Sequence, residues 1–357
     1  MPPSVETLRA AVREAPTVVR EARLAERIIF VGGHPGCGKT MMTPIVGALA
    51  RVEIQKFNYP LEHICALHLL GRIADDVAVT MVRMLTDLDL YNMAMARETN
   101  FRWSDVSSVL TNPAPWRYFR RLVTPGDAVA VERIKQERLI LQLTTHNLLA
   151  ISPALFLALG DRFRLLEVVR HPLYMIKQWH KYIDRYASDV RDFTIWFDYE
   201  GRTLPFFVHG WEERWLRANP MDRVIFSIDR LTQLGERAME RLSDAQRPQI
   251  LIMPFERFVL DPWPYLRRLE EMLGTQVTAL TRKELKRQKV PRKMIADGLA
   301  RPIYKEYGWQ PPEQGASERR ELNKRRQYAV EFASAEGMET LDRMCAAYEA
   351  QHLREIV

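Results

Sequence analysis

The chain has 357 residues, of which 47% are hydrophobic and 27% are charged. This composition excludes a mainly disordered chain and is enough for a sizeable core, in one large α/β domain with insertions or in two domains. The three cysteines are too few and too scattered for a disulfide framework or a cysteine-based zinc site. The longest apolar run, 148–160, is too short to cross a bilayer, and the amino-terminal segment lacks the apolar core of a signal peptide. We therefore expect a cytoplasmic protein.

The formal net charge of +7 is unevenly distributed. Residues 281–330 hold 14 Lys and Arg against 6 Asp and Glu, an excess larger than that of the whole chain. A basic segment on an otherwise balanced body favours an anionic ligand, such as a phosphate, a sulfate, a nucleotide or a nucleic acid. A solvated helix face would have the same composition.

Apolar periodicity predicts strands that alternate with helices along most of the chain. The predicted strands cover 27–33, 51–57, 139–145, 164–169, 224–228 and 250–255, and a hairpin is expected over 193–207. The predicted helices cover 1–25, 39–50, 60–97, 153–160, 172–186 and 263–274, with further helices and basic loops over 278–353. This alternation predicts an α/β protein with a mostly parallel sheet between layers of helices.

The strongest local signal is the octapeptide Gly33–Thr40, Gly-His-Pro-Gly-Cys-Gly-Lys-Thr, which matches G-x-x-x-x-G-K-T between a predicted strand and a predicted helix. Small residues let backbone N–H groups turn inward around phosphate oxygens, and the start of the helix adds its dipole. Lys39 contributes a point charge. A magnesium-dependent kinase or nucleotide triphosphatase would also need Thr40 on the metal and an acidic residue after a nearby strand, for which Asp229 is the candidate.

Two further blocks follow the phosphate loop. Residues 139–185 contain a strand ending in Thr145-His146, a helix opened by Pro153, and a strand that runs into Arg170-His171-Pro172. Residues 249–274 contain a strand ending in Phe255-Glu256, a proline-containing loop and a helix that closes in Leu-Gly. In this order the blocks resemble the PAPS-dependent sulfotransferases, whose donor is 3′-phosphoadenosine 5′-phosphosulfate. The resemblance covers residues 27–274 and implies a P-loop-type sulfotransferase fold with helical insertions and a helical C-terminal region.

The resemblance also implies roles for single residues. His146 matches the general base of the family, and Glu98 is an alternative base because some members that act on glycans or proteins use a glutamate from this region. In the loop, Gly36 stands where the family has a basic residue, so Lys39 would supply the catalytic cation. Arg170 matches the arginine that binds the 3′-phosphate. The donor would be held by Pro35, Gly36, Cys37, Gly38, Lys39, Thr40, Met41, Arg170, Gln178, Arg292 and Lys293, the last two standing in for a late Arg-Lys-Gly segment.

These observations predict a sulfotransferase that moves a sulfuryl group from the phosphosulfate donor to a hydroxyl or amine of a carbohydrate or small natural product. Adenosine 3′,5′-bisphosphate would leave, and no metal would be needed. We expect an N-terminal helix over 1–26, a core over 27–275, and a basic region over 276–357 that closes over the nucleotide in the same domain. The alternatives are a magnesium-dependent P-loop kinase or triphosphatase, and a non-catalytic nucleotide or nucleic-acid binder; the latter is disfavoured because no nucleic-acid module is recognisable. The sequence leaves the acceptor and the oligomeric state open.

Overall fold

The computed structural model describes residues 16–103, 105–183, 189–299, 305, 310–313 and 317–354. Its central sheet has the strand order β2-β3-β1-β4-β7, and every neighbouring pair is parallel. The strands are β1 (Ile28–Gly32), β2 (Lys56–Phe57), β3 (Leu141–Thr144), β4 (Phe163–Val169) and β7 (Ile250–Pro254). β1 and β3 are buried along their whole length, as expected for central strands covered on both faces. The predicted α/β class with a parallel sheet is confirmed.

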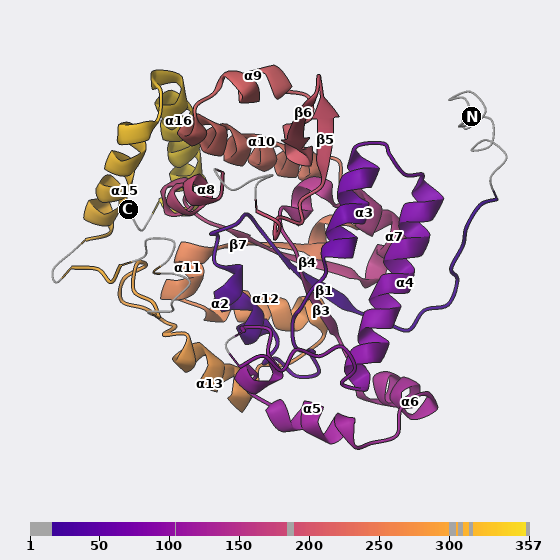
Figure 1. Cartoon of the computed structure of the whole chain (residues 1–357). Coiled ribbons are helices and arrows are strands. Elements are labelled where there is room, and N and C mark those ends of the chain that lie inside the picture. The colour runs from indigo at the N-terminus through magenta and orange to yellow at the C-terminus, as the bar shows by residue number, and fades with distance from the viewer. Residues whose placement is uncertain are drawn as a thin grey trace.

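Helices surround this sheet, with α2, α12 and α13 on one side and α3, α4 and α7 on the other (Figure 1). The first half of the chain contributes α2 (Lys39–Val46), α3 (Tyr59–Leu69), α4 (Asp75–Ala94), α5 (Pro115–Leu122), α6 (Ala128–Glu137) and α7 (Pro153–Leu159). The second half contributes α8 (Ile176–Ile183), α9 (Glu212–Arg217), α10 (Pro220–Glu240), α11 (Phe255–Leu260), α12 (Trp263–Leu273), α13 (Ala279–Arg287), α15 (Glu318–Phe332) and α16 (Ala335–His352). The predicted hairpin is present as β5 (Trp196–Tyr199) and β6 (Arg202–Pro205). Among the described residues, no helix is long and apolar enough to cross a membrane.

The predicted strand over 224–228 is wrong, because these residues lie inside α10. The side chain of Asn219 caps the start of α10, and Pro220 occupies its first turn. All five residues of the run are buried, since α10 packs against α8, α16 and the turn at 148–151. A short apolar run of this kind fits a buried helix as well as a buried strand, and periodicity does not separate the two. Asp229 therefore does not end a strand; it pairs with Arg343 of α16 at 2.9 Å.

The expected N-terminal helix is not found over residues 16–26, which have no helical structure, and residues 1–15 lie outside the described residues. The segment instead runs along α4. The backbone N–H groups of Leu24 and Ala25 donate to the carboxylate of Asp87, each at 3.0 Å, and Arg20 pairs with the same carboxylate at 2.7 Å. Side chains of α4 thus take the hydrogen bonds that a helix would form within itself.

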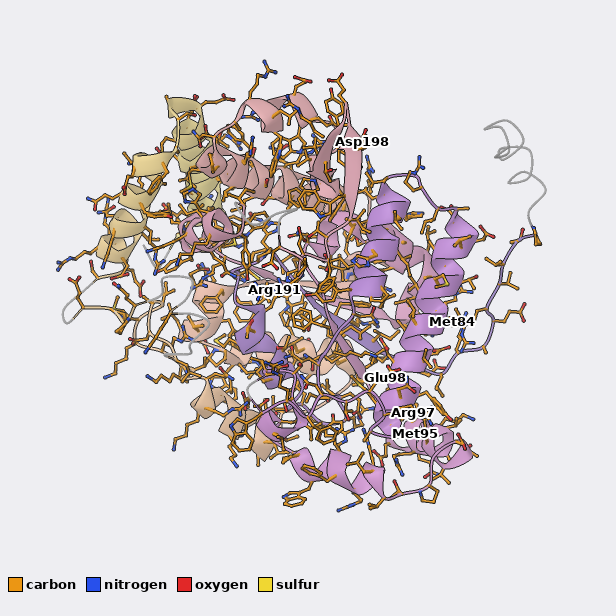
Figure 2. All side chains as sticks on the ribbon, in the orientation of Figure 1. Met84, Met95, Arg97, Glu98, Arg191 and Asp198 are labelled. Carbon is orange, nitrogen blue, oxygen red and sulfur yellow. The ribbon has the colours of Figure 1, made fainter. Side chains whose placement is uncertain are left out.

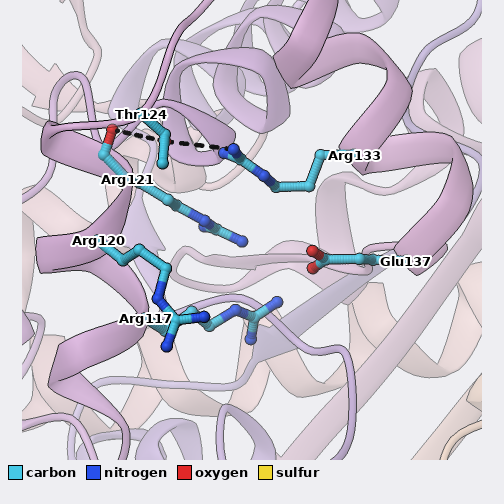
Figure 3. Close-up of a pocket in the computed structure, with 6 residues that line it drawn as sticks. All are labelled: Arg117, Arg120, Arg121, Thr124, Arg133 and Glu137. Atoms are coloured by element: carbon cyan, nitrogen blue, oxygen red, sulfur yellow. Dashed lines mark hydrogen bonds between the residues drawn. The ribbon is translucent and has the colours of Figure 1, made fainter.

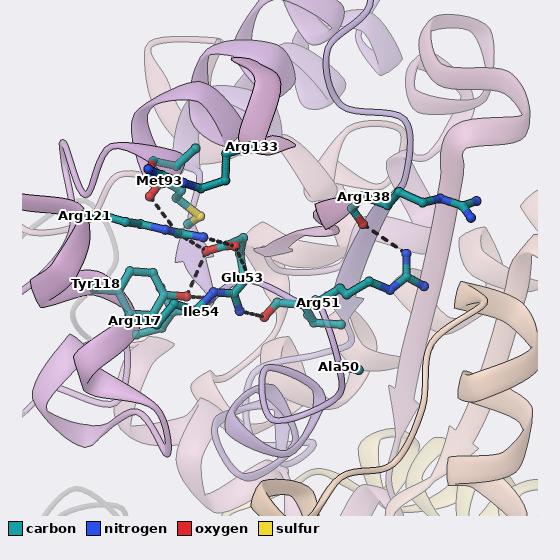
Figure 4. Close-up of polar contacts among 12 residues, drawn as sticks. Ala50, Arg51, Glu53, Ile54, Met93, Arg117, Tyr118, Arg121, Arg133 and Arg138 are labelled. Carbon is teal, nitrogen blue, oxygen red and sulfur yellow. Dashed lines mark hydrogen bonds and ion pairs between the residues drawn. The ribbon is translucent and has the colours of Figure 1, made fainter. Parts of the chain in front are cut away.

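A buried charge network attaches α5 to the edge of the sheet, just before β2 (Figure 4). The carboxylate of Glu53 is fully buried and accepts hydrogen bonds from Arg117 at 2.6 Å, from Arg121 at 2.8 and 3.0 Å, and from the hydroxyl of Tyr118 at 2.9 Å. Burial alone would raise the pKa of Glu53, but the two guanidinium groups reverse this effect and hold the pKa below its ordinary value. Glu53 is therefore ionised at neutral pH and neutralises part of the charge of α5.

Replacement of Glu53 by glutamine is expected to lower the free energy of unfolding at pH 7 by about 3–5 kcal/mol, because it leaves the buried guanidinium of Arg121 without a counter-charge. Since the folded-state pKa of Glu53 is lowered, this contribution is present above its unfolded pKa near 4.5 and is lost as the pH falls below that value. Urea unfolding at pH 7 and pH 4 measures both effects. Glu336→Gln, which removes an exposed ion pair with Arg214, is the control and should cost less than about 1 kcal/mol. Equal losses in the two variants would contradict the network's role.

Candidate active site

The phosphate loop leaves β1 at Gly32 and enters α2 at Lys39. Gly33, Gly36 and Gly38 have φ angles of 127°, 85° and 110°, a region that strains residues with a side chain. At Gly38, a Cβ would also collide with the ring of Phe255. No side chain caps the N-terminus of α2, so its first N–H groups remain available to an anion. The local sequence thus forms the phosphate-binding conformation for steric reasons.

The loop is held from two directions. Lys39 is buried, and its Nζ donates to the carbonyl oxygens of Gly33 and, at 3.1 Å, of His34. From α8, the indole Nε1 of Trp179 donates to the carbonyl of Pro35 at 2.8 Å. The ammonium group of Lys39 therefore lies inside the loop, where an oxyanion bound by the loop would meet it.

Gly36 is the position at which the sulfotransferase pattern has a basic residue, and its surroundings leave little room for a side chain. A Cβ there would lie 3.0 Å from Oε1 of Gln178 and 3.4 Å from the Cα of Met175, and the positive φ adds strain. Gln178, predicted to contact the donor, thus lies directly beside the loop. The positive charge at this end of the loop comes instead from Arg170, which donates to the carbonyl of Gly36 at 2.9 Å.

Arg170 follows β4 and lies against two aromatic rings. Its guanidinium is 4.7 Å from the ring centroid of Tyr174 and 4.2 Å from that of Phe255, a separation at which cation–π attraction is appreciable. Its Nε is buried and has no hydrogen-bond partner among the described residues. A buried N–H without an acceptor is costly, so this one indicates a place for an anion.

Two more arginines reach these rings from the C-terminal region, and we call Arg170, Arg292 and Arg325 the arginine cluster. Arg325 on α15 lies 4.2 Å from the ring centroid of Tyr174, and its Nε is also buried without a partner among the described residues. Burial lowers the pKa of Arg325. Arg292 lies 5.5 Å from the ring centroid of Phe255. Sequence reasoning singled out Arg292 but missed Arg325, whose only signal is its place in the basic segment; Lys293 is exposed.

His146 directly follows the β3 end of the sheet and contacts Glu62 of α3. One carboxylate oxygen, Oε2 of Glu62, lies 3.0 Å from the backbone N–H and 3.4 Å from Nδ1 of His146. Burial raises the pKa of Glu62, but the hydrogen bond and charge of His146 outweigh it, so the pKa lies below its ordinary value. An ionised Glu62 assigns the proton of the neutral imidazole to Nδ1 and leaves Nε2 as a proton acceptor. Glu62 was missed because its segment has only a helical pattern.

Glu98, the alternative base, is already paired with a cation. Its side chain is 54% exposed beyond the end of α4, and its carboxylate lies 2.9 Å from the ammonium of Lys56 (Figure 2). The hydrogen bond from Lys56 holds the pKa of Glu98 below its ordinary value, which weakens it as a base. The polar residues expected to crowd around Glu98 are divided, since Arg102 forms a separate exposed pair with Asp105 at 3.6 Å.

A carboxyl group that the sequence did not single out, Glu167 of β4, lies beneath the loop. A Cβ on Gly32 would collide with its Oε2, which is buried and has no partner among the described residues. Burial raises the pKa of Glu167 to about 8, and the nearby charge of Lys39 offsets only part of this effect. Glu167 is therefore mostly protonated and uncharged at neutral pH.

The remaining loop residues have mainly packing roles. His34 contacts Oδ1 of Asn147 through Nδ1 at 2.8 Å, and burial lowers its pKa to about 4, so it is uncharged. Burial raises the pKa of the Cys37 thiol, which makes this cysteine an unreactive small residue. Thr40 is half-buried in the first turn of α2, and Met41 is buried and touches Arg292 through its sulfur at 3.3 Å.

No family model matches the chain, and no curated protein matches it. Three solved structures are similar to it. They are the sulfotransferase domain from the curacin biosynthetic pathway (11% identity, TM-score 0.45, covering 90% of this chain and 98% of that chain), the sulfotransferase domain of the Synechococcus PCC 7002 olefin synthase (11%, 0.43, 92% and 96%) and sulfotransferase STF9 from Mycobacterium avium (15%, 0.41, 97% and 81%). At such low identities the similarity concerns the fold alone.

Proposed function

We propose that the protein is a sulfotransferase that takes its sulfuryl group from 3′-phosphoadenosine 5′-phosphosulfate. The acceptor is a hydroxyl or amine of a carbohydrate or small natural product. One observation carries this proposal: around a single phosphate loop lie two separate cationic groups, Lys39 and the arginine cluster, and a neutral histidine with an accepting nitrogen. A donor with phosphate groups at both ends of its ribose needs the two cationic groups, and an attacking hydroxyl needs the histidine.

In this proposal the residues divide the donor between them. The loop N–H groups and Lys39 hold the 5′-phosphosulfate, and the arginine cluster holds the 3′-phosphate. The buried, unpartnered Nε atoms of Arg170 and Arg325 support the second assignment, because an anion would supply their missing acceptors. Arg292 and Arg325 come from the region 276–357, which would thereby close over the nucleotide as part of the same domain. Gln178 is placed to donate its amide beside the loop.

The reaction needs one proton acceptor and one cation. His146 accepts the proton of the acceptor group at Nε2 while the oxygen or nitrogen of that group forms its bond to sulfur, and Glu62 stabilises the imidazolium that results. The bond between sulfur and the bridging oxygen breaks, and Lys39 with the loop N–H groups stabilises the negative charge on that oxygen. The products are the sulfated acceptor and adenosine 3′,5′-bisphosphate, with the proton on His146.

The magnesium-dependent alternative loses its acidic residue. Asp229 lies within α10 and pairs with Arg343, and the carboxyl group nearest the loop strand, Glu167, is mostly protonated at neutral pH. Neither residue is suited to hold Mg²⁺ beside Thr40.

Calorimetric titration with adenosine 3′,5′-bisphosphate and with ATP, each with and without Mg²⁺, tests the proposal. We expect saturable, metal-independent binding of the bisphosphate and much weaker binding of ATP. Magnesium-dependent ATP binding without any preference for the 3′-phosphate would overturn the proposal and direct attention to a kinase or triphosphatase.

His146→Ala is expected to lower turnover by about 10²–10⁴-fold, because the attacking group loses its proton acceptor. Binding of adenosine 3′,5′-bisphosphate should stay nearly unchanged, which separates a chemical role from a folding defect. Turnover is measured as bisphosphate release with an acceptor found by screening hydroxyl- and amine-bearing compounds. Glu98→Gln is the matched comparison and should retain most of the turnover. If instead His146→Ala keeps full turnover and Glu98→Gln loses it, Glu98 is the base.

A further inference from the structure

A second cationic site lies far from the phosphate loop. A cavity of about 240 Å³ opens between α5 and α6, and six residues line it (Figure 3): Arg117, Arg120, Arg121, Thr124, Arg133 and Glu137. It adjoins Glu53, which precedes β2, whereas the phosphate loop follows the last residue of β1. Because the strands are parallel, the two sites lie at opposite ends of the sheet. The cavity therefore does not belong to the candidate active site.

The charges around this cavity do not cancel. Its lining has four arginines and the carboxylate of Glu137, and Glu53 lies beneath Arg117 and Arg121. Four positive and two negative groups leave an excess of two positive charges. This excess matches a doubly charged anion and gives an anion a reason to enter.

The guanidinium groups also keep N–H donors in reserve. Each guanidinium has five N–H groups. Arg133 donates to the carbonyl of Ala94 at 2.7 Å and to Oγ1 of Thr124 at 3.2 Å, and neither contact uses a carboxylate. Arg120 is exposed and has no hydrogen bond or ion pair within the described part of the chain. Holding α5 on the sheet through Glu53 therefore explains Arg117 and Arg121 but neither Arg120 nor Arg133.

The cavity is built before any ligand arrives. Arg121 is only 4% exposed and is fixed by Glu53 and by the carbonyl of Met93 at 2.9 Å. A rigid floor of this kind lets an anion bind without first ordering the side chains, which lowers the cost of binding. The volume is several times that of one water molecule, about 30 Å³ in the liquid, so a tetrahedral oxyanion fits with part of a group attached to it.

We propose that this arginine-lined cavity is an oxyanion site that binds a phosphate or sulfate group, either as the free ion or as a monoester. The fork of each guanidinium suits two-point recognition of the oxygens of such a group. The site is separate from the donor site, and it would exist whether or not the proposed sulfotransferase activity is correct.

The test is calorimetric titration at constant ionic strength with sodium sulfate, sodium phosphate and, as a singly charged comparison, sodium chloride. The wild type, the double variant Arg120→Gln/Arg133→Gln and the control Arg237→Gln are compared. Arg237 is exposed on α10. Lys39→Ala is titrated in parallel, because the phosphate loop also binds oxyanions. Arg120→Gln alone serves as a second variant, since the removal of an exposed side chain should not affect folding.

We expect the double variant to lose at least tenfold in affinity for sulfate or phosphate at one site, while Arg237→Gln and Lys39→Ala retain that site and chloride does not compete at equal concentration. Glucose 6-phosphate and glucose 6-sulfate distinguish the sources: tighter binding than the inorganic ions identifies a monoester ligand, and weaker binding identifies the free ion. Unchanged oxyanion binding in both arginine variants, or the loss of all binding in Lys39→Ala, overturns the proposal.

Discussion

Arg170→Ala is expected to weaken the binding of adenosine 3′,5′-bisphosphate by about 10–100-fold while changing the binding of adenosine 5′-monophosphate by less than about threefold. A hydrogen bond between charged partners contributes roughly 1.5–3 kcal/mol, which corresponds to this factor. Arg170 is suited to this role because its Nε is buried without a partner among the described residues, and because Tyr174 and Phe255 hold its guanidinium in place. Calorimetric titration of both nucleotides measures the difference.

Two comparisons make this result specific. The 5′-monophosphate reports on the loop itself, since Arg170 also donates to the carbonyl of Gly36. Arg325→Ala should show the same preference for loss of the bisphosphate if the arginine cluster acts as one clamp, and Arg237→Ala should show no loss. If Arg170→Ala weakens both nucleotides equally, Arg170 supports the loop and does not bind the 3′-phosphate.

Glu167→Gln is expected to stabilise the protein, and the gain should increase with pH. In the folded state burial raises the pKa of Glu167 from 4.5 to about 8, so the folded protein keeps a proton that the unfolded chain has lost. Stability is therefore fully retained below about pH 4.5 and falls as the pH rises towards 8. A neutral glutamine removes this loss. We expect the free energy of unfolding of the variant, relative to the wild type, to be about 2–4 kcal/mol more favourable at pH 8 than at pH 5.

Urea unfolding of both proteins at pH 5 and pH 8 measures this difference. Glu336→Gln, at an exposed position, is the control and should show no pH-dependent gain. A constant difference between Glu167→Gln and the wild type at both pH values would mean that Glu167 is ionised in the folded protein. Such a result would also return Glu167 to consideration as a ligand for Mg²⁺.

The elements that the sequence predicted well are those set by near neighbours in the chain. The phosphate loop depends on glycines within six residues and on the strand and helix that flank them. The strands before and after it, β1, β3, β4 and β7, are continuous apolar runs bounded by polar residues, and a run of that kind is buried in a parallel sheet. The segment 224–228 has the same local pattern, and only its packing beneath α8 and α16 shows that it is helical.

The sequence by itself therefore determined the fold class, the phosphate loop and the positions of His146 and Arg170 at the ends of their strands, because each depends on residues close together in the chain. The tertiary structure alone decided which side chains meet at those positions. Glu62 lies 84 residues from His146, and Arg325 reaches the ring of Tyr174 from another helix. It also decided the state of Glu167, since the pKa of a carboxyl group depends on how completely the rest of the chain excludes water from it.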